Sequence, residues 1–198
     1  MTGRVCIGFD ARIRPGSRSD LPAPLIGGRT FLSADPSVWL PPQALADQWN
    51  GPIPDWGNSL GLAKDVHALR PFPTGPDDCL VALTASKHVV ATEIQRAGPG
   101  YFDVIRSERE LLADGWTLVG FDALDTSGLI SGLHGCGFAE PSLLYFQHHF
   151  WPQLNEACLF ETDRDAAAFG AYRGVEIREH APFVEVGVCV KSPAIQEW

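Results

Sequence analysis

Proline is distributed unevenly along this chain, and its distribution constrains the fold more than any other feature of the sequence. Eleven of the 16 prolines fall before residue 77. Because proline fixes φ and lacks a backbone donor, it disfavours long helices and central strands in that region. The same region contains Trp39, Trp49 and Trp56, and tryptophan is costly to leave in water. We therefore predict a Pro/Trp-rich ordered strap over residues 35–62 that packs on the domain, in place of a flexible linker.

Outside the strap, the hydrophobic pattern predicts four strands. Residues 5–13 and 184–190 alternate apolar residues with polar or small ones, which is the pattern of a half-buried strand. Residues 79–83 are continuously apolar, as in a buried strand. Residues 116–124 give the fourth strand.

Helices are predicted where apolar residues recur at helical spacing behind a capping residue. In the clearest case Thr162 precedes Ala166, Phe169 and Arg173, which share one helical face. Ser86 is a second expected N-cap. The predicted helices cover residues 41–49, 86–97, 107–115, 142–151 and 162–172.

These elements predict an α+β fold in a single domain spanning residues 1–198: a mixed sheet of about four strands with four or five helices packed on it. A length of 198 residues lies within the usual range for one domain. A fully parallel sheet is disfavoured because the outer strands alternate apolar and polar residues, whereas strands buried in parallel sheets are continuously apolar.

Composition and charge narrow the class of partner. Hydrophobic residues make up 45% of the chain and charged residues 20%, so a core can form. The formal net charge of -9 would repel nucleic-acid phosphates. The acidic Asp10 lies too close to the N-terminus for the apolar segment of a signal peptide to precede it. No stretch of the sequence has the length and apolarity of a membrane span. We therefore expect a cytoplasmic protein that binds neither nucleic acid nor a membrane.

The glycine-rich segment 126–138 is the candidate catalytic segment. Nucleophilic catalysis needs a serine or cysteine beside a base and an orienting acid, and such residues lie close together here: Asp122, Asp125, Ser131, His134 and Cys136. The nucleophile-elbow pattern G-x-S-x-G is absent, because Ser131 lies one position late, and so are the common nucleotide and metalloprotease motifs. A small cytosolic hydrolase or transferase that uses the turn at 126–138 with His134 and Cys136 is therefore the alternative hypothesis. The two aspartates are expected to cap the turn that follows them.

Zinc is a second possibility that the spacing disfavours. Imidazole and thiol groups fall within 25 positions, at His134, Cys136, His148, His149 and Cys158. Structural zinc sites use close ligand pairs at C-x₂₋₄-C or H-x₃₋₅-H spacing, whereas His-x-Cys is too tight and adjacent histidines on a helix point about 100° apart. We predict no metal and no cofactor. The scattered cysteines are expected to be reduced, with Cys79, Cys158 and Cys189 acting as small buried hydrophobes.

The distribution of charge is the most informative feature for function. Residues 1–99 contain nine basic and nine acidic residues, whereas residues 100–198 contain six basic and 15 acidic ones. The whole net charge therefore comes from the second half. Carboxylates around aromatic anchors suit a basic protein partner. The predicted partner-binding residues are Glu140, Trp151, Glu156, Glu161, Asp163 and Asp165.

A small, acidic, cytosolic α+β chain without catalytic motifs is similar in general character to the immunity proteins that neutralise bacterial toxins. The resemblance rests on size, charge and the lack of motifs. Many of these toxins are nucleases, whose surfaces must be basic to hold nucleic acid. The resemblance implies a non-enzymatic bacterial protein that binds and blocks a basic toxin. The simplest competing interpretation is that the charge serves only solubility.

Overall fold

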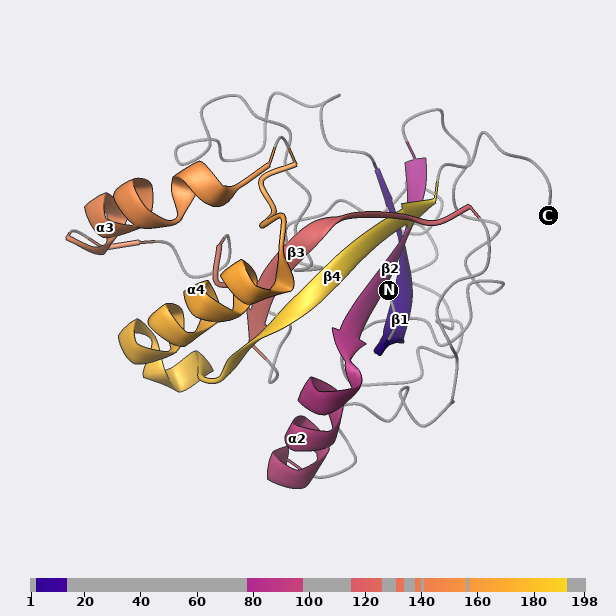
Figure 1. The fold of residues 1–198 in the computed structure, drawn as a ribbon, viewed down its shortest axis with the longest axis horizontal. Coiled ribbons are helices and arrows are strands. Elements are labelled where there is room, and N and C mark those ends of the chain that lie inside the picture. Colours follow the sequence, from indigo (N-terminus) through magenta and orange to yellow (C-terminus); the bar gives the residue numbers. More distant parts are fainter. Residues whose placement is uncertain are drawn as a thin grey trace, which may run out of the picture. The chain divides into compact units, whose positions relative to one another are not determined.

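The computed structural model describes residues 3–13, 78–97, 115–125, 131–133, 138–139, 141–155 and 157–191 (Figure 1). The predicted strap over residues 35–62 lies outside the described residues, as does the helix predicted over residues 107–115 except for Gly115. The candidate site residues outside them are His134, Cys136, Glu140 and Glu156.

The described residues form four strands and three α-helices, which confirms the predicted α+β class. Two short 3-10 helices, η4 and η5, follow α3 and α4. In chain order the elements are β1 (Arg4–Ile13), β2 (Asp78–Ser86), α2 (Lys87–Ala97), β3 (Thr117–Asp125), α3 (Ser142–His149), η4 (Trp151–Gln153), α4 (Asp163–Glu176), η5 (Arg178–His180) and β4 (Phe183–Lys191).

The strands form one sheet in the order β1-β2-β4-β3. The sheet is antiparallel rather than mixed, and alternating apolar and polar residues are indeed more typical of antiparallel strands. The three described α-helices are fewer than the four or five predicted. Two of the predicted helices fall largely outside the described residues, and the one predicted over 142–151 ends at His149.

The chain divides into two compact units. Unit 1 comprises residues 1–14, 39–118 and 189–198, and unit 2 comprises residues 15–38 and 119–188. The single domain over residues 1–198 stays a prediction.

In unit 1, β1 and β2 pair antiparallel, from Arg4 opposite Ser86 to Ile13 opposite Asp78. Residues 5–9 of β1 are all buried, so this part of the strand is covered on both faces and is not half-buried as the alternation predicts. The alternation misleads here because its second set of residues includes a cysteine and a glycine, which are small and readily buried. In β2, residues 80–85 are all buried, as the apolar run predicts.

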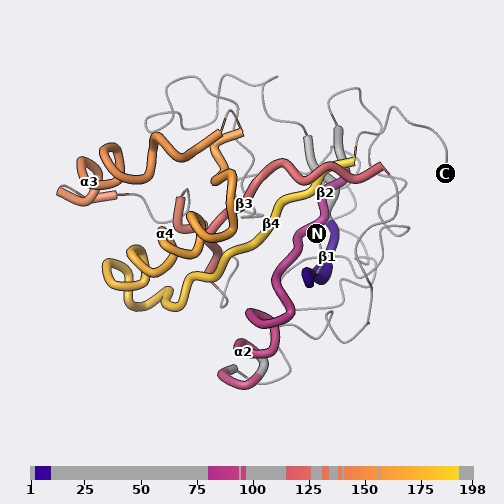
Figure 2. The backbone as a smooth tube through the Cα atoms, viewed as in Figure 1, coloured from indigo at the N-terminus to yellow at the C-terminus, as the bar shows by residue number. Residues whose placement is uncertain are grey.

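The chain passes directly from β2 into α2 (Figure 2). The backbone N–H of Val89 donates to Ser86 Oγ at 3.1 Å, which confirms the predicted N-cap. Further along α2, the carboxylate of Glu93 is buried and pairs with Arg96 at 2.8 Å. The buried charge is therefore compensated within the helix.

In unit 2, Phe169 of α4 lies at the centre of an aromatic core. Its ring centroid lies 5.7 Å from that of Phe146, 5.1 Å from Phe150 and 5.3 Å from Phe160. These contacts hold α3 and α4 side by side (Figure 1). Ala166, Phe169 and Arg173 are all buried, which confirms that their spacing marks the core face of α4.

Two glycines of α4 form a matched pair for a test of this packing. A Cβ at Gly170 would lie 2.9 Å from the carbonyl oxygen of Phe183, whereas a Cβ at Gly174 would have its nearest neighbour at 3.6 Å. Gly170→Ala therefore requires a backbone shift and should lower the free energy of unfolding by about 1–3 kcal/mol. Gly174→Ala should raise it by up to about 1 kcal/mol, because alanine favours the helix. Urea denaturation measures both changes, and a Gly170→Ala variant as stable as the wild type would contradict the packing of α4 on β4.

Candidate functional site

The start of α4 brings together three of the predicted partner-binding residues. Glu161 and Asp163 are exposed and flank Thr162, and Asp165 follows in the first turn. Phe150, which directly follows α3, packs edge-on against Phe160 with ring centroids 6.4 Å apart. Phe150 directly precedes Trp151 in the chain, and Phe160 directly precedes Glu161. Because the two rings are in contact, Trp151 and Glu161 lie at the same end of the α3/α4 pair. Glu140 and Glu156 are outside the described residues.

Asp165 has a structural role that the charge pattern does not reveal. Its backbone N–H donates to Thr162 Oγ1 at 3.1 Å, and the Thr162 hydroxyl donates to Asp165 Oδ2 at 2.6 Å. This arrangement caps α4, and carboxylates in a first turn also interact favourably with the helix dipole. The half-buried Asp165 therefore stabilises the helix, which leaves Glu161 and Asp163 as the exposed carboxylates at this end.

Trp151 is half-buried rather than fully exposed. Its ring packs at 90° against that of Phe146, with centroids 6.1 Å apart. Part of the side chain thus belongs to the edge of the aromatic core. Only the remainder is available to a partner, so Trp151 is a smaller anchor than the sequence suggests.

Three large apolar side chains in the described residues are exposed instead, and the charge pattern singles out none of them. They are Leu144, Tyr145 and Val175. The sequence carries a partial signal, since Tyr145 and His149 form one i, i+4 row on α3 and Phe146 and Phe150 form the adjacent row. Both rows are aromatic, so spacing alone does not tell which one is buried.

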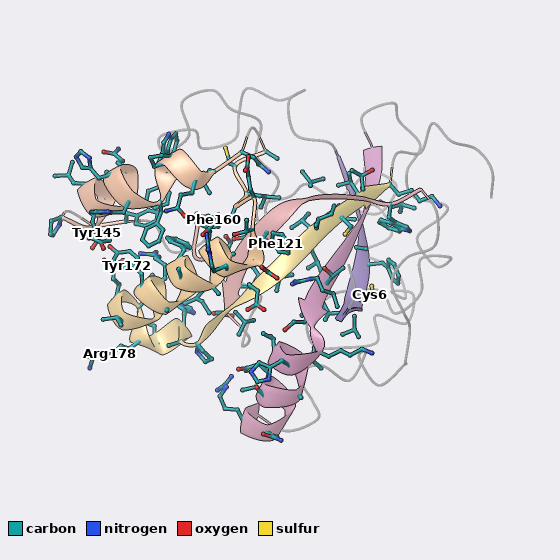
Figure 3. All side chains as sticks on the ribbon, viewed as in Figure 1. Cys6, Phe121, Tyr145, Phe160, Tyr172 and Arg178 are labelled. Atoms are coloured by element: carbon teal, nitrogen blue, oxygen red, sulfur yellow. The ribbon has the colours of Figure 1, made fainter. Side chains whose placement is uncertain are left out.

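Tyr145 belongs to a ladder of rings that joins α3 to α4 (Figure 3). Its ring stacks on that of Tyr172 with centroids 5.0 Å apart and planes inclined by 24°. The imidazole of His149 lies on the same tyrosine, with centroids 4.1 Å apart. The Tyr172 hydroxyl donates to Glu176 Oε1 at 2.5 Å, and Arg173 Nη1 donates to Glu176 Oε2 at 2.8 Å.

These hydrogen bonds shift two pKa values in opposite directions. Partial burial, together with the hydrogen bond to Glu176, raises the pKa of Tyr172 to about 12. Burial alone would raise the pKa of Glu176, but hydrogen bonds with Ser142, Tyr172 and Arg173 outweigh it and lower that pKa. At neutral pH the ladder therefore ends in a neutral tyrosine and an ionised glutamate.

A separate set of polar groups is buried around the glycine-rich segment. The hydroxyl of Ser131 donates to Asp122 Oδ1 at 2.9 Å and accepts from the backbone N–H of Leu133 at 3.1 Å. The backbone N–H of Ala123 also donates to Asp122 Oδ1, at 2.7 Å. Asp122 and Ser131 are both fully buried. The aspartate thus ties β3 to the glycine-rich segment through Ser131. The residues directly after the strand, where the cap is expected, lie outside the described residues.

Asp125 has a different partner, as expected for a residue three positions along a strand from Asp122. Its Oδ2 lies 2.8 Å from Nδ1 of His180, which belongs to η5. Asp125 is fully buried, whereas the His180 side chain is 28% exposed. In catalytic triads a buried carboxylate orients the histidine that acts as the base, but His180 is not among the candidate residues that the sequence suggests. No pattern marks it, because 55 positions separate the two residues.

The geometry does not favour Ser131 as a nucleophile. Its hydroxyl is buried and already engaged as both donor and acceptor. Within the described residues, no group of three or more His, Cys, Asp or Glu side chains could hold a metal ion. In the same part of the chain, no helix combines the length and apolarity needed to cross a membrane. Cys158 and Cys189 are buried as predicted, and burial raises the pKa of Cys189 to about 11.

The role of Ser131 can be tested by its removal. Ser131→Ala should lower the free energy of unfolding by about 1–3 kcal/mol, because a buried carboxylate and a buried N–H each lose a partner. The exposed Thr92→Ala on α2 is a control that should change stability by less than about 0.5 kcal/mol. Urea denaturation compares the two variants. If Ser131→Ala were as stable as the control, the hydroxyl would be dispensable for folding. That result would support a catalytic role for Ser131.

Glu176 makes the fold sensitive to acid. Because its pKa in the folded chain lies below the ordinary value of 4.5, its ionisation stabilises the fold above that pH, and this contribution is lost as the pH falls through the folded-state pKa. Glu176→Gln should therefore destabilise the protein near neutral pH and much less at about pH 3. Glu179→Gln, on exposed η5, is the control. Denaturation series at several pH values give the comparison, and a Glu176→Gln effect that does not change with pH would contradict it.

The comparisons with known proteins identify no relative of this chain. No family model matches it, and neither a curated protein nor a solved structure matches it.

Proposed function

We propose that this chain is a non-enzymatic module that binds a basic protein, most specifically a bacterial immunity protein that neutralises a nuclease-type toxin in the cytoplasm. The observation that carries the proposal is the pair of exposed carboxylates, Glu161 and Asp163, at the start of α4. They lie in the half of the chain that carries the whole net charge of -9.

Electrostatics connects this observation to a toxin. A nuclease holds its substrate largely through basic residues that contact phosphates. An acidic protein is attracted to the same surface at long range, and complementary charge accelerates encounter. A protein that covers the basic surface also denies it to nucleic acid. The same negative charge disfavours direct binding of this chain to DNA or RNA.

One observation favours the alternative, a small hydrolase or transferase. His180 and Asp125 form a base and orienting acid beside the glycine-rich segment. In that case His180, rather than His134, is the candidate base. A nucleophile would have to come from a residue other than the buried Ser131, with Cys136 the candidate that the sequence names.

Co-expression tests the proposal directly. The first step is to inspect the genes next to the one that encodes this chain, because the proposal requires one of them to encode a toxin domain. That toxin-domain protein is the probe, produced in a bacterial host with and without the chain, and the lack of such a gene would count against the proposal. We expect growth to be restored and the two purified proteins to form a stable complex. A purified chain that neither binds that toxin nor protects the host would overturn the proposal. Turnover of a substrate that is lost in His180→Gln would support the enzyme.

Two neighbouring exposed residues provide a matched test of charge. Glu161→Lys should slow association with the toxin by about two- to tenfold at low salt, because it removes long-range attraction. Arg164→Glu, three positions later and also exposed, should accelerate association. Both effects should shrink when salt reduces the Debye length below about 10 Å. Stopped-flow mixing at low and high salt measures the rates, and rates that neither substitution changes would mean that this charge serves solubility alone.

A further inference from the structure

We infer that the toxin is held by an apolar patch on the α3/α4 pair, formed by Leu144, Tyr145, Tyr172 and Val175 and here termed the helix-pair patch. The inference rests on the proposed function and assigns its anchoring surface. It replaces Trp151 as the principal anchor, because that side chain is half-buried against Phe146.

The exposure of the patch is its first distinguishing feature. Leu144 is 51% exposed, Tyr145 48% and Val175 71%. Single exposed apolar residues are normal on protein surfaces, but a contiguous group indicates an interaction site.

The members of the patch are neighbours. The rings of Tyr145 and Tyr172 stack at 5.0 Å across the two helices (Figure 3). Val175 follows Tyr172 by three positions on α4, which places it on the adjoining part of the same helix surface. Leu144 directly precedes Tyr145 on α3 and points about 100° away from it, so it lies on the adjoining part of the helix surface. The apolar surface therefore continues from one helix to the other.

The tyrosines are held in place before any partner arrives. Tyr145 packs against both Tyr172 and His149. The Tyr172 hydroxyl is fixed by Glu176, which in turn accepts from the buried Arg173. Rigid aromatic side chains lose little conformational entropy on binding, so this patch is suited to anchoring a partner.

Charge identifies the occupant as a basic protein. Asp163 and Val175 are 12 positions apart on α4, which corresponds to about 18 Å along the helix. An interface of standard size covers about 800 Å² on each partner and is thus about 30 Å across. One interface can therefore include both the carboxylates at the start of α4 and the patch near its end. A second copy of a chain with net charge -9, or an anionic lipid surface, would be repelled instead.

The patch and the carboxylates should affect different rate constants. Exposed charges mainly accelerate association, whereas desolvated apolar anchors mainly slow dissociation. Leu144→Gln with Val175→Gln removes apolar surface at two exposed helical positions without touching the core. Ala91→Gln with Thr92→Gln introduces the same side chain at two exposed positions of α2 and serves as the matched control.

The experiment measures binding of both double variants to the toxin-domain protein that the proposed function requires a neighbouring gene to encode, by surface plasmon resonance at physiological salt. We expect the patch variant to dissociate at least about tenfold faster than wild type, with association changed less than twofold and an unaltered melting temperature. The control should behave as wild type. In hydrogen exchange, α3 and α4 should become protected in the wild-type complex.

Three outcomes overturn the inference, and they are distinguishable. If wild type binds and the patch variant dissociates at the same rate, the patch is not the anchor although the proposed function stands. If wild type does not bind the toxin, both fail. If wild type sediments as a dimer that the patch variant converts to a monomer, the occupant is a second copy of this chain.

Discussion

The organisation of unit 2 depends on one buried cation, Arg173. Its side chain is 2% exposed, and an arginine at that depth is strongly destabilising unless its donors are paired. Its Nε donates to the carbonyl of Gly132 at 3.0 Å and its Nη1 donates to Glu176, while the guanidinium lies 4.2 Å from the centroid of the Phe138 ring. The cation therefore links the glycine-rich segment, the end of α4 and the aromatic core.

This position couples two regions that no sequence pattern connects. One is the buried polar group of Asp122 and Ser131, which holds residues 131–133 on β3. The other is the ladder of Tyr145 and Tyr172, whose last hydrogen bond ends on the carboxylate that Arg173 also binds. Both regions meet at a single guanidinium. The polar groups near the glycine-rich segment are accordingly explained by the needs of folding, because each of these hydrogen bonds satisfies a group that would be costly to bury alone.

The extent to which the sequence predicts this structure follows from the range of the interactions involved. The N-caps at Ser86 and Thr162 and the core face of α4 are local, so spacing is enough to predict them. The partner of Asp125 is His180, 55 positions away, and no local pattern contains that information. Spacing places Tyr145 and Phe146 on α3 equally well. Which of the two is buried depends on Phe169 of another helix, so it is decided by tertiary packing.

Counting charges has a similar limit at the start of α4. Asp165 contributes to the acidic total, yet its carboxylate accepts a hydrogen bond from Thr162, the residue that caps the helix. The N-terminus of a helix also carries a partial positive charge, which offsets part of the field of any carboxylate beside it. Glu161 precedes the helix and is not bonded into the cap, so its charge should be offset less than those of Asp163 and Asp165. If the chain binds a basic partner as proposed, exposed charges would mainly govern association and apolar surface would mainly govern the lifetime of the complex. The described residues offer such apolar surface on Leu144, Tyr145 and Val175.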